Sequence, residues 1–329
     1  MRNGSLAQNL ELNAVWRRVR HITMQMGIQQ FMLLLALVVI FTVMGLINPR
    51  FLSVANMVNI ARQISINVVI ATGATFCILS GGIDLSVGSV GIMCGCLTAI
   101  FLIRTQLIFA GILLGFAIGA CAGLINGLLI SRLRVPPFVV TLGMMTIGRG
   151  IALLTTGGLV ISGLPQAFTV IGTGWIGPIP VPVVIAVFVA VAGHFLLTRT
   201  EFGLRCYAVG GNYEAARMSG IDTAKIITSV YVMQGTLAAL GGLILTGRVL
   251  SAQPALMGQA NLDAIAATVI GGTSLGGGKG NIVGTVLGSI LVGSLYNALN
   301  IIGVGYYTQL VVIGCIIILA VYIDTLTRK

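Results

Sequence analysis

The feature that most limits how this chain can fold is a series of apolar segments, most of them close to 20 residues long, that recurs from residue 27 to the C-terminus. A helix of about 20 residues spans the hydrocarbon core of a bilayer, where only helices and closed barrels satisfy their backbone hydrogen bonds. Only 8% of the residues are charged, against about a quarter in soluble domains. We therefore predict an all-α, polytopic helical membrane protein with about ten transmembrane helices, at residues 27–47, 57–79, 88–103, 107–130, 138–154, 183–197, 226–245, 262–271, 282–299 and 307–323.

The basic residues predict how these spans are oriented. The chain carries 18 lysine and arginine residues and a formal net charge of +11. Thirteen of the 18 fall in segments that this topology places in the cytosol, three in outer segments and two within spans, in agreement with the positive-inside rule. We expect a cytoplasmic N-terminal tail (residues 1–26), a transmembrane domain (residues 27–329) and both termini in the cytosol. Because the charges form no continuous basic face, they indicate contact with a membrane and argue against a nucleic-acid partner.

One span carries glycines at a strict spacing of four, namely Gly111, Gly115, Gly119, Gly123 and Gly127. Residues four apart form one ridge of an α-helix, and a ridge without side chains lets a neighbouring membrane helix approach closely. The pattern therefore predicts tight helix packing, which we favour over a role in ligand binding.

The longest polar run after the N-terminal tail is residues 198–222, which lie between two apolar spans. Within this run, residues 212–218 (NYEAARM) are helix-forming and are flanked by Gly210-Gly211 and by Gly220. Asparagine is a favoured helix N-cap and glycine a favoured C-terminal stop. We therefore predict a short, capped, exposed helix with glycine hinges at both ends, where a protein outside the membrane can bind.

Residues 207–222 (YAVGGNYEAARMSGID) resemble the coupling-helix segment of ABC-importer permeases, and in particular that of the ribose-, galactose- and xylose-type sugar permeases. Residues 80–89 (SGGIDLSVGS) and 270–284 (IGGTSLGGGKGNIVG) resemble the same family in the same order. The resemblance runs from about residue 48 to the C-terminus. It is specific for the family and only weakly specific for the sugar.

This resemblance implies the membrane-spanning subunit of an importer in the bacterial inner membrane. It implies a cytosolic ABC ATPase that holds ATP and Mg, a periplasmic sugar-binding protein, and a second copy or paralogue of the permease. Glu214 and Arg217 are then expected to bond polar groups of the ATPase, and Ala215 and Ala216 to let the helix enter a cleft. The full set of residues expected to couple to the ATPase is Gly210, Gly211, Asn212, Glu214, Ala215, Ala216, Arg217, Ser219 and Gly220.

The residues themselves supply neither an energy source nor a catalytic centre. Residues 273–280 (TSLGGGKG) lack both the first glycine and the final serine or threonine of a phosphate-binding loop. None of the seven acidic residues falls in mid-span, which argues against coupling to an ion gradient. His21 and His194 lack the setting of a catalytic triad, and the six cysteines show no disulfide or zinc spacing. We expect a permease that is not an enzyme and binds no metal or cofactor itself.

Four charged residues within or near spans are candidates for a translocation path or a gate. Arg62 and Arg149 lie within spans, where inserting an arginine costs about 2.5–3.5 kcal/mol unless it faces the bundle or water. Pairing with a backbone carbonyl is the alternative for Arg149. Asp84 and Asp263 lie near span ends, and for Asp84 we favour a structural role as the cap of the helix that follows.

These observations favour the transmembrane subunit of an ATP-driven importer for a sugar, either a pentose, a hexose or a related polyol. An ABC permease for another solute, such as a branched-chain amino acid or a nucleoside, remains open. An ion-driven carrier is the third possibility, and the positions of the acidic residues argue against it.

Overall fold

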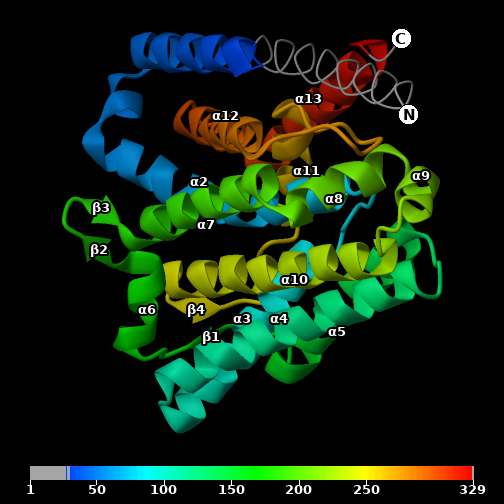
Figure 1. The fold of residues 1–329 in the computed structure, drawn as a ribbon. Helices are drawn as coiled ribbons and strands as arrows, with labels where there is room; N and C mark the ends of the chain where they lie inside the picture. Colours follow the sequence, from blue (N-terminus) through cyan, green and yellow to red (C-terminus); the bar gives the residue numbers. More distant parts are fainter. Residues whose placement is uncertain (1–26, 28–29, 328–329) are drawn as a thin grey trace, which may run out of the picture.

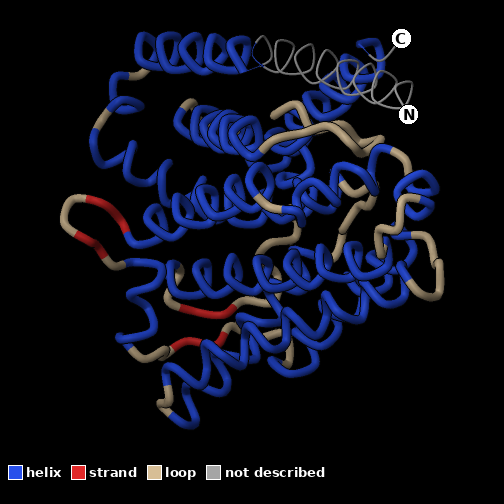
Figure 2. The backbone as a smooth tube through the Cα atoms, viewed as in Figure 1, coloured by secondary structure: helices blue, strands red, loops and turns tan. Residues whose placement is uncertain are grey.

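The computed structural model describes residue 27 and residues 30–327, and this part of the chain is almost entirely helical (Figure 2). The strands within it are four segments of two residues each. β1 (Ile161–Ser162) pairs antiparallel with β4 (Ser251–Ala252), and β2 (Trp175–Ile176) pairs antiparallel with β3 (Ile179–Pro180). The predicted all-α, polytopic fold is confirmed. The predicted cytoplasmic tail, residues 1–26, lies outside the described residues.

The helices follow one another along the chain as Figure 1 shows. A first helix (Gln30–Ile47) is followed by a short 3-10 helix, η1 (Pro49–Leu52). The remaining helices are α2 (Val54–Leu79), α3 (Val87–Thr105), α4 (Ile108–Ser131), α5 (Pro137–Thr156), α6 (Gln166–Thr173), α7 (Val181–Arg199), α8 (Glu201–Gly211), α9 (Tyr213–Met218), α10 (Thr223–Arg248), α11 (Ala260–Ile270), α12 (Ile282–Ile301) and α13 (Tyr306–Thr327).

Among the described residues, eight helices are long and apolar enough to cross a membrane: the first helix, α2, α3, α4, α5, α7, α10 and α12. Shorter apolar helices occupy the places of the two other predicted spans, α11 and the segment Tyr306–Ile316 of α13. At 1.5 Å per residue, the 11 residues of α11 extend only about 16 Å, roughly half the hydrocarbon thickness of a bilayer. Each predicted span is therefore a helix, but α11 is too short to cross the membrane alone.

The predicted close packing of the glycine ridge is confirmed, and its partner is α10. A Cβ added at Gly119 would overlap the carbonyl oxygen of Gly235, and one added at Gly123 would overlap that of Tyr231. At Gly127 the added atom would lie 2.7 Å from the Cα of Thr228. The two helices thus meet backbone to backbone along three successive turns.

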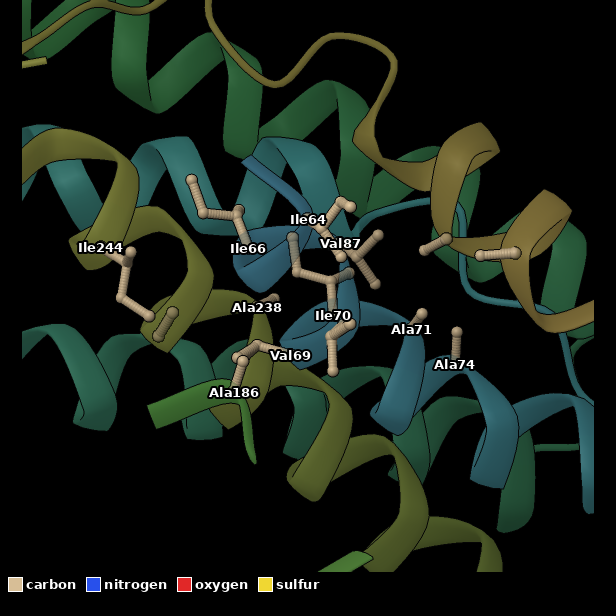
Figure 3. Close-up of a cluster of buried hydrophobic side chains, with 14 of the residues drawn as sticks. Ile64, Ile66, Val69, Ile70, Ala71, Ala74, Val87, Ala186, Ala238 and Ile244 are labelled. Atoms are coloured by element: carbon tan, nitrogen blue, oxygen red, sulfur yellow. The ribbon is translucent and has the colours of Figure 1, made fainter. Parts of the chain in front are cut away.

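α2 forms the centre of the bundle and is buried along most of its length. Figure 3 shows Ile66, Val69 and Ile70 of α2 beside Ala238 of α10 and Ala186 of α7. Several polar side chains of α2, such as Asn56, Asn59 and Arg62, lie in the first half of the helix, and from Ile64 to Leu79 the helix is buried almost throughout.

The end of the bundle opposite α9 is ordered by long-range contacts. The glycine- and proline-rich segment at residues 155–181 contains β1, α6, β2 and β3 (Figure 1). Phe168 of α6 is 1% exposed and packs with Leu102 and Leu243, and β1 pairs with β4 in the segment between α10 and α11. Local glycine and proline content does not report these contacts.

Candidate coupling site

α9 is the predicted short helix, and both of its ends are capped by side-chain or backbone groups. The Asn212 side-chain oxygen accepts a hydrogen bond from the backbone N–H of Ala215 (2.9 Å). At the other end, Gly220 has φ +82°, its N–H donates to the Arg217 carbonyl, and the N–H of Ile221 donates to the Ala216 carbonyl, both at 3.1 Å. This is the glycine-terminated arrangement that satisfies the last carbonyls of a helix. The predicted caps are therefore confirmed.

The exposed face of α9 carries an ion pair, and its other face is packed into the protein. Glu214 and Arg217 are 2.9 Å apart and both are more than half exposed. Ala216 is 5% exposed and belongs to an apolar cluster with the neighbouring helices. Ala216 is thus covered by its own chain, and the expectation that Ala215 and Ala216 let the helix enter a cleft of the ATPase stays a prediction. Ala215 is exposed, and so is Met218 (81%), an apolar side chain that the sequence analysis overlooked.

The polar segment before α9 is a helix rather than a loop. α8 is capped by the Thr200 hydroxyl and ends with Gly210 and Gly211 as its last two residues. An Arg205–Glu201 ion pair (2.7 Å) lies on its exposed side. Three glycines in 11 residues give this segment a low intrinsic helix propensity. Burial of Cys206 and Val209 against the bundle outweighs that low propensity.

Two of the three stretches that carry the family resemblance, residues 207–222 and 270–284, meet in space at the end of the bundle where α9 lies. Both also touch Leu79, the residue before the third stretch. The N–H of Gly278 donates to the carbonyl of Leu79, the last residue of α2, at 2.8 Å. The Tyr207 hydroxyl of α8 donates to the carbonyl of Gly280 at 2.7 Å. A Cβ on Gly210 would overlap the Leu79 carbonyl oxygen and lie 2.8 Å from the Gly278 nitrogen. Sequence reasoning used these motifs only for recognition and did not detect that they touch.

Asp84 lies in the extended segment that joins α2 to α3. Its Oδ1 accepts hydrogen bonds from the N–H (2.8 Å) and the hydroxyl (2.5 Å) of Ser86, and Asn126 of α4 donates to the Ser86 hydroxyl oxygen (3.1 Å). Ser86 itself occupies the N-cap position of α3, so Asp84 shapes the turn before the helix and does not cap it as predicted. Burial raises the pKa of Asp84 above its ordinary value, and the two bonds from Ser86 act in the opposite direction.

The other three candidate path residues have separate surroundings. Arg62 donates to the Thr173 carbonyl (3.1 Å), and its guanidinium carbon lies 4.8 Å from the ring centroid of Trp175, at the end of the bundle opposite α9. Asp263 accepts a hydrogen bond from the Tyr296 hydroxyl (2.9 Å), and Arg149 is exposed on α5. The structure does not gather these residues with Asp84 into one site. A part in the translocation path stays a prediction for each of the four.

Comparison with known proteins assigns the family. A family model described as "Branched-chain amino acid transport system / permease component" matches residues 56–321. The ribose import permease protein of Bacillus subtilis (strain 168) is 44% identical over 292 residues, which cover 88% of this chain and 91% of that protein. In Escherichia coli (strain K12), the D-allose transport system permease protein is 38% identical over 295 residues (89% and 90%), and the L-arabinose transport system permease protein is 34% identical over 301 residues (91% and 92%). No solved structure matches the chain. With its apolar helices and its match over most of its length, the chain is a multi-pass protein of the bacterial inner membrane that belongs to the family of branched-chain amino acid transport system permease components.

Proposed function

We propose that this chain is the transmembrane subunit of an ATP-driven ABC importer that carries a sugar across the inner membrane. The observation that carries the proposal is the capped, exposed helix α9, which follows directly after α8, the helix that packs against Leu79 and the 270–284 stretch. Relatives named as ribose, allose and arabinose permeases support a pentose or a hexose as the substrate.

The partners follow from the placement of this helix. A cytosolic ATPase, which binds ATP and Mg, docks on α9, where the Glu214–Arg217 pair and Met218 are accessible. A sugar-binding protein delivers substrate at the opposite end, near α6 and the β2–β3 hairpin. A second copy or a paralogue of the permease completes the pore. This chain contributes no nucleotide site of its own.

The mechanism is mechanical. When ATP closes the ATPase, its grip moves α9, and the spans shift between outward-facing and inward-facing arrangements whose balance ATP biases. Glu214 and Arg217 satisfy each other in this structure, so docking exchanges that exposed pair for bonds to the ATPase. An exposed pair contributes only about 0–1 kcal/mol, and the exchange therefore costs little.

The similar proteins also help to choose between a sugar and the other possible substrates. The family description mentions branched-chain amino acids, but the similar proteins named here are sugar permeases at 34–44% identity. Similarity over about nine-tenths of both chains favours a sugar over an amino acid or a nucleoside, and an ATP-driven permease over an ion-driven carrier.

The test reconstitutes the permease with its cognate ATPase and binding protein in liposomes and measures sugar uptake. We expect uptake to require ATP and to fall about tenfold or more in Glu214→Lys, which reverses a charge on α9. Glu201→Lys is the matched control, because it breaks a similar exposed pair on α8 without changing α9. Uptake that persists without ATP, or that survives in Glu214→Lys, contradicts the proposal.

A further inference from the structure

Gly210 lies where three segments of backbone touch. The C-terminal carbonyl of α2, at Leu79, accepts the Gly278 N–H, and Gly210 of α8 packs against both groups. The contact is reciprocal, since a Cβ on Gly277 would lie 2.6 Å from the Gly210 carbonyl oxygen. Gly277 and Gly278 have φ of +77° and +70°, a conformation that glycine adopts without strain.

Tyr207 adds a polar contact on the same face of α8, three residues before Gly210. Its hydroxyl donates to the carbonyl of Gly280, two residues beyond Gly278. Burial raises the pKa of Tyr207 to about 12, so the phenol keeps the proton that it donates at physiological pH. α8 is therefore attached to the segment between α11 and α12 at two points.

Each segment that α8 touches is bonded to further helices. Beyond Leu79, the Ile83 carbonyl accepts hydrogen bonds from Thr141 of α5 (3.3 Å) and Tyr231 of α10 (3.4 Å). Beyond Gly280, Asn281 caps α12 through the N–H of Gly284 (2.7 Å). Asn281 also accepts a hydrogen bond from Gln30 of the first helix (3.0 Å).

The geometry argues against a hinge at Gly210. α8 remains helical through Gly211, and the N–H of Asn212 donates to the Ala208 carbonyl, so the backbone is hydrogen-bonded across both glycines. A hinge residue absorbs a change in φ and ψ, whereas Gly210 is held by atoms on two sides. The absence of a side chain at Gly210 instead allows the backbone of α8 to approach the backbone at Leu79 and Gly278 closely.

We propose that Tyr207 and Gly210 are positioning residues that pass the displacement of α9 through α8 to the α2–α3 and α11–α12 segments together. We call this set of contacts around Tyr207 and Gly210 the joint, and its assignment rests on the proposed ATP-driven function. Because the contact at Gly210 is between backbones, no flexible side chain lies between the helix and the two segments, and a movement of α8 shifts both of them. Because the joint transmits motion, it affects the coupling of ATP hydrolysis to sugar transport and not the hydrolytic activity of the ATPase itself.

The chain offers a matched pair of substitutions to test the joint. Gly210→Ala places a methyl group into the Leu79 carbonyl, whereas Gly143→Ala, which adds the same methyl group to a helical glycine of α5, meets nothing within 4 Å. Tyr207→Phe removes only the hydroxyl. Each variant is reconstituted with the cognate ATPase and binding protein, and sugar uptake is measured beside ATP hydrolysis with and without the loaded binding protein.

We expect Gly210→Ala to lower uptake and binding-protein-stimulated hydrolysis about tenfold or more while unstimulated hydrolysis and complex assembly stay near wild type. Tyr207→Phe is expected to lower uptake about two- to tenfold, the range of one lost hydrogen bond, and Gly143→Ala to keep uptake within about twofold. If Gly210→Ala does not assemble, Tyr207→Phe decides the question.

Three results would contradict the proposed role of the joint. They are normal uptake in Gly210→Ala or Tyr207→Phe, equal losses in Gly210→Ala and Gly143→Ala, and a proportional loss of stimulated and unstimulated hydrolysis. Normal uptake in Gly210→Ala together with a loss in Glu214→Lys refutes the joint and leaves the importer function standing. Uptake without ATP in the wild type refutes the function itself.

Discussion

At the residue scale, several glycines matter because their missing side chain lets two backbones touch. Gly123 of α4 faces the Tyr231 carbonyl of α10 and Gly210 of α8 faces the Leu79 carbonyl, in both cases without room for a methyl group. Other glycines, such as Gly143 of α5, have open space where a Cβ would stand. The spacing of four identified the first kind in α4, whereas nothing in the sequence around Gly210 separates it from Gly211.

Gly123→Ala is expected to destabilise the protein by about 1–3 kcal/mol, the usual cost of overpacking a filled interface. The apparent melting temperature of the purified protein in detergent measures this loss. Gly143→Ala is the matched control, because its methyl group meets nothing within 4 Å and alanine favours the helix. Equal melting temperatures for the two variants would contradict the assignment of Gly123 to a backbone contact.

Asp84 predicts a pH dependence of stability. Since its pKa is raised in the folded protein, the folded state binds more protons than the unfolded state between the unfolded value, about 3.9, and the raised folded value. The cost of burying the charge is absent below the unfolded pKa and grows as the pH rises through the folded one. Asp84→Asn keeps an oxygen that accepts from Ser86 and removes the charge.

We therefore expect the melting temperature of the wild type to fall relative to Asp84→Asn as the pH is raised from about 4 toward neutrality. Glu201→Gln serves as the control, because Glu201 is 82% exposed and its charge stays in water. Parallel melting curves for the wild type and Asp84→Asn at every pH would show that burial of Asp84 carries no such cost.

At the scale of elements, length and apolar content predicted the spans well, whereas local propensity does not account for the short helices α6 and α8. α6 and α8 hold β-branched residues and glycines, which weaken a helix in isolation. Phe168 in α6 and Cys206 in α8 are nevertheless buried in the bundle, and this tertiary packing determines their structure. α9 was predicted correctly because its signals, Asn212 and Gly220, act within the helix itself.

Gly220→Pro is expected to remove the end of α9, because proline has no N–H to donate to Arg217 and cannot adopt φ +82°. Uptake and transport-stimulated ATP hydrolysis should fall about tenfold or more while membrane insertion stays intact. Gly157→Pro imposes the same backbone conflict on the C-cap of α5 (φ +63°) without altering α9. Coupling lost equally in both variants would assign the effect to general destabilisation.

At the scale of the whole molecule, the two ends of the bundle are built differently, and their assignment to the two sides of the membrane rests on the basic residues. α9 lies at one end, and α6 with the β2–β3 hairpin lies at the other (Figure 1). The sequence located the ten apolar helices from their apolar content. It gave no sign that residues 207–222 and 270–284 meet beside Leu79, because contacts between distant segments leave no periodic pattern in the chain.

Cysteine labelling with a membrane-impermeant thiol reagent checks this orientation. In a protein without the exposed Cys121 and Cys315, we expect Pro178→Cys in the β2–β3 turn to react in right-side-out vesicles, and Met218→Cys in α9 to react only in inside-out vesicles. The reverse pattern would invert the topology. Labelling of both positions from one side would refute the predicted odd number of crossings between them.

The backbone-to-backbone contact between α4 and α10 limits how this protein can move. The main chains of α4 and α10 touch over three turns, so no side chains lie between them that could repack when the helices shift. The two helices must therefore move together as one rigid body. Only Ser219, Gly220 and Ile221 separate the end of α9 from the Asp222 cap of α10, so a displacement of α9 is passed directly to this pair of helices. Alternation between the two sides of the membrane must then be accommodated where side chains line the boundary, as between α7 and α2, and not within the α4–α10 pair.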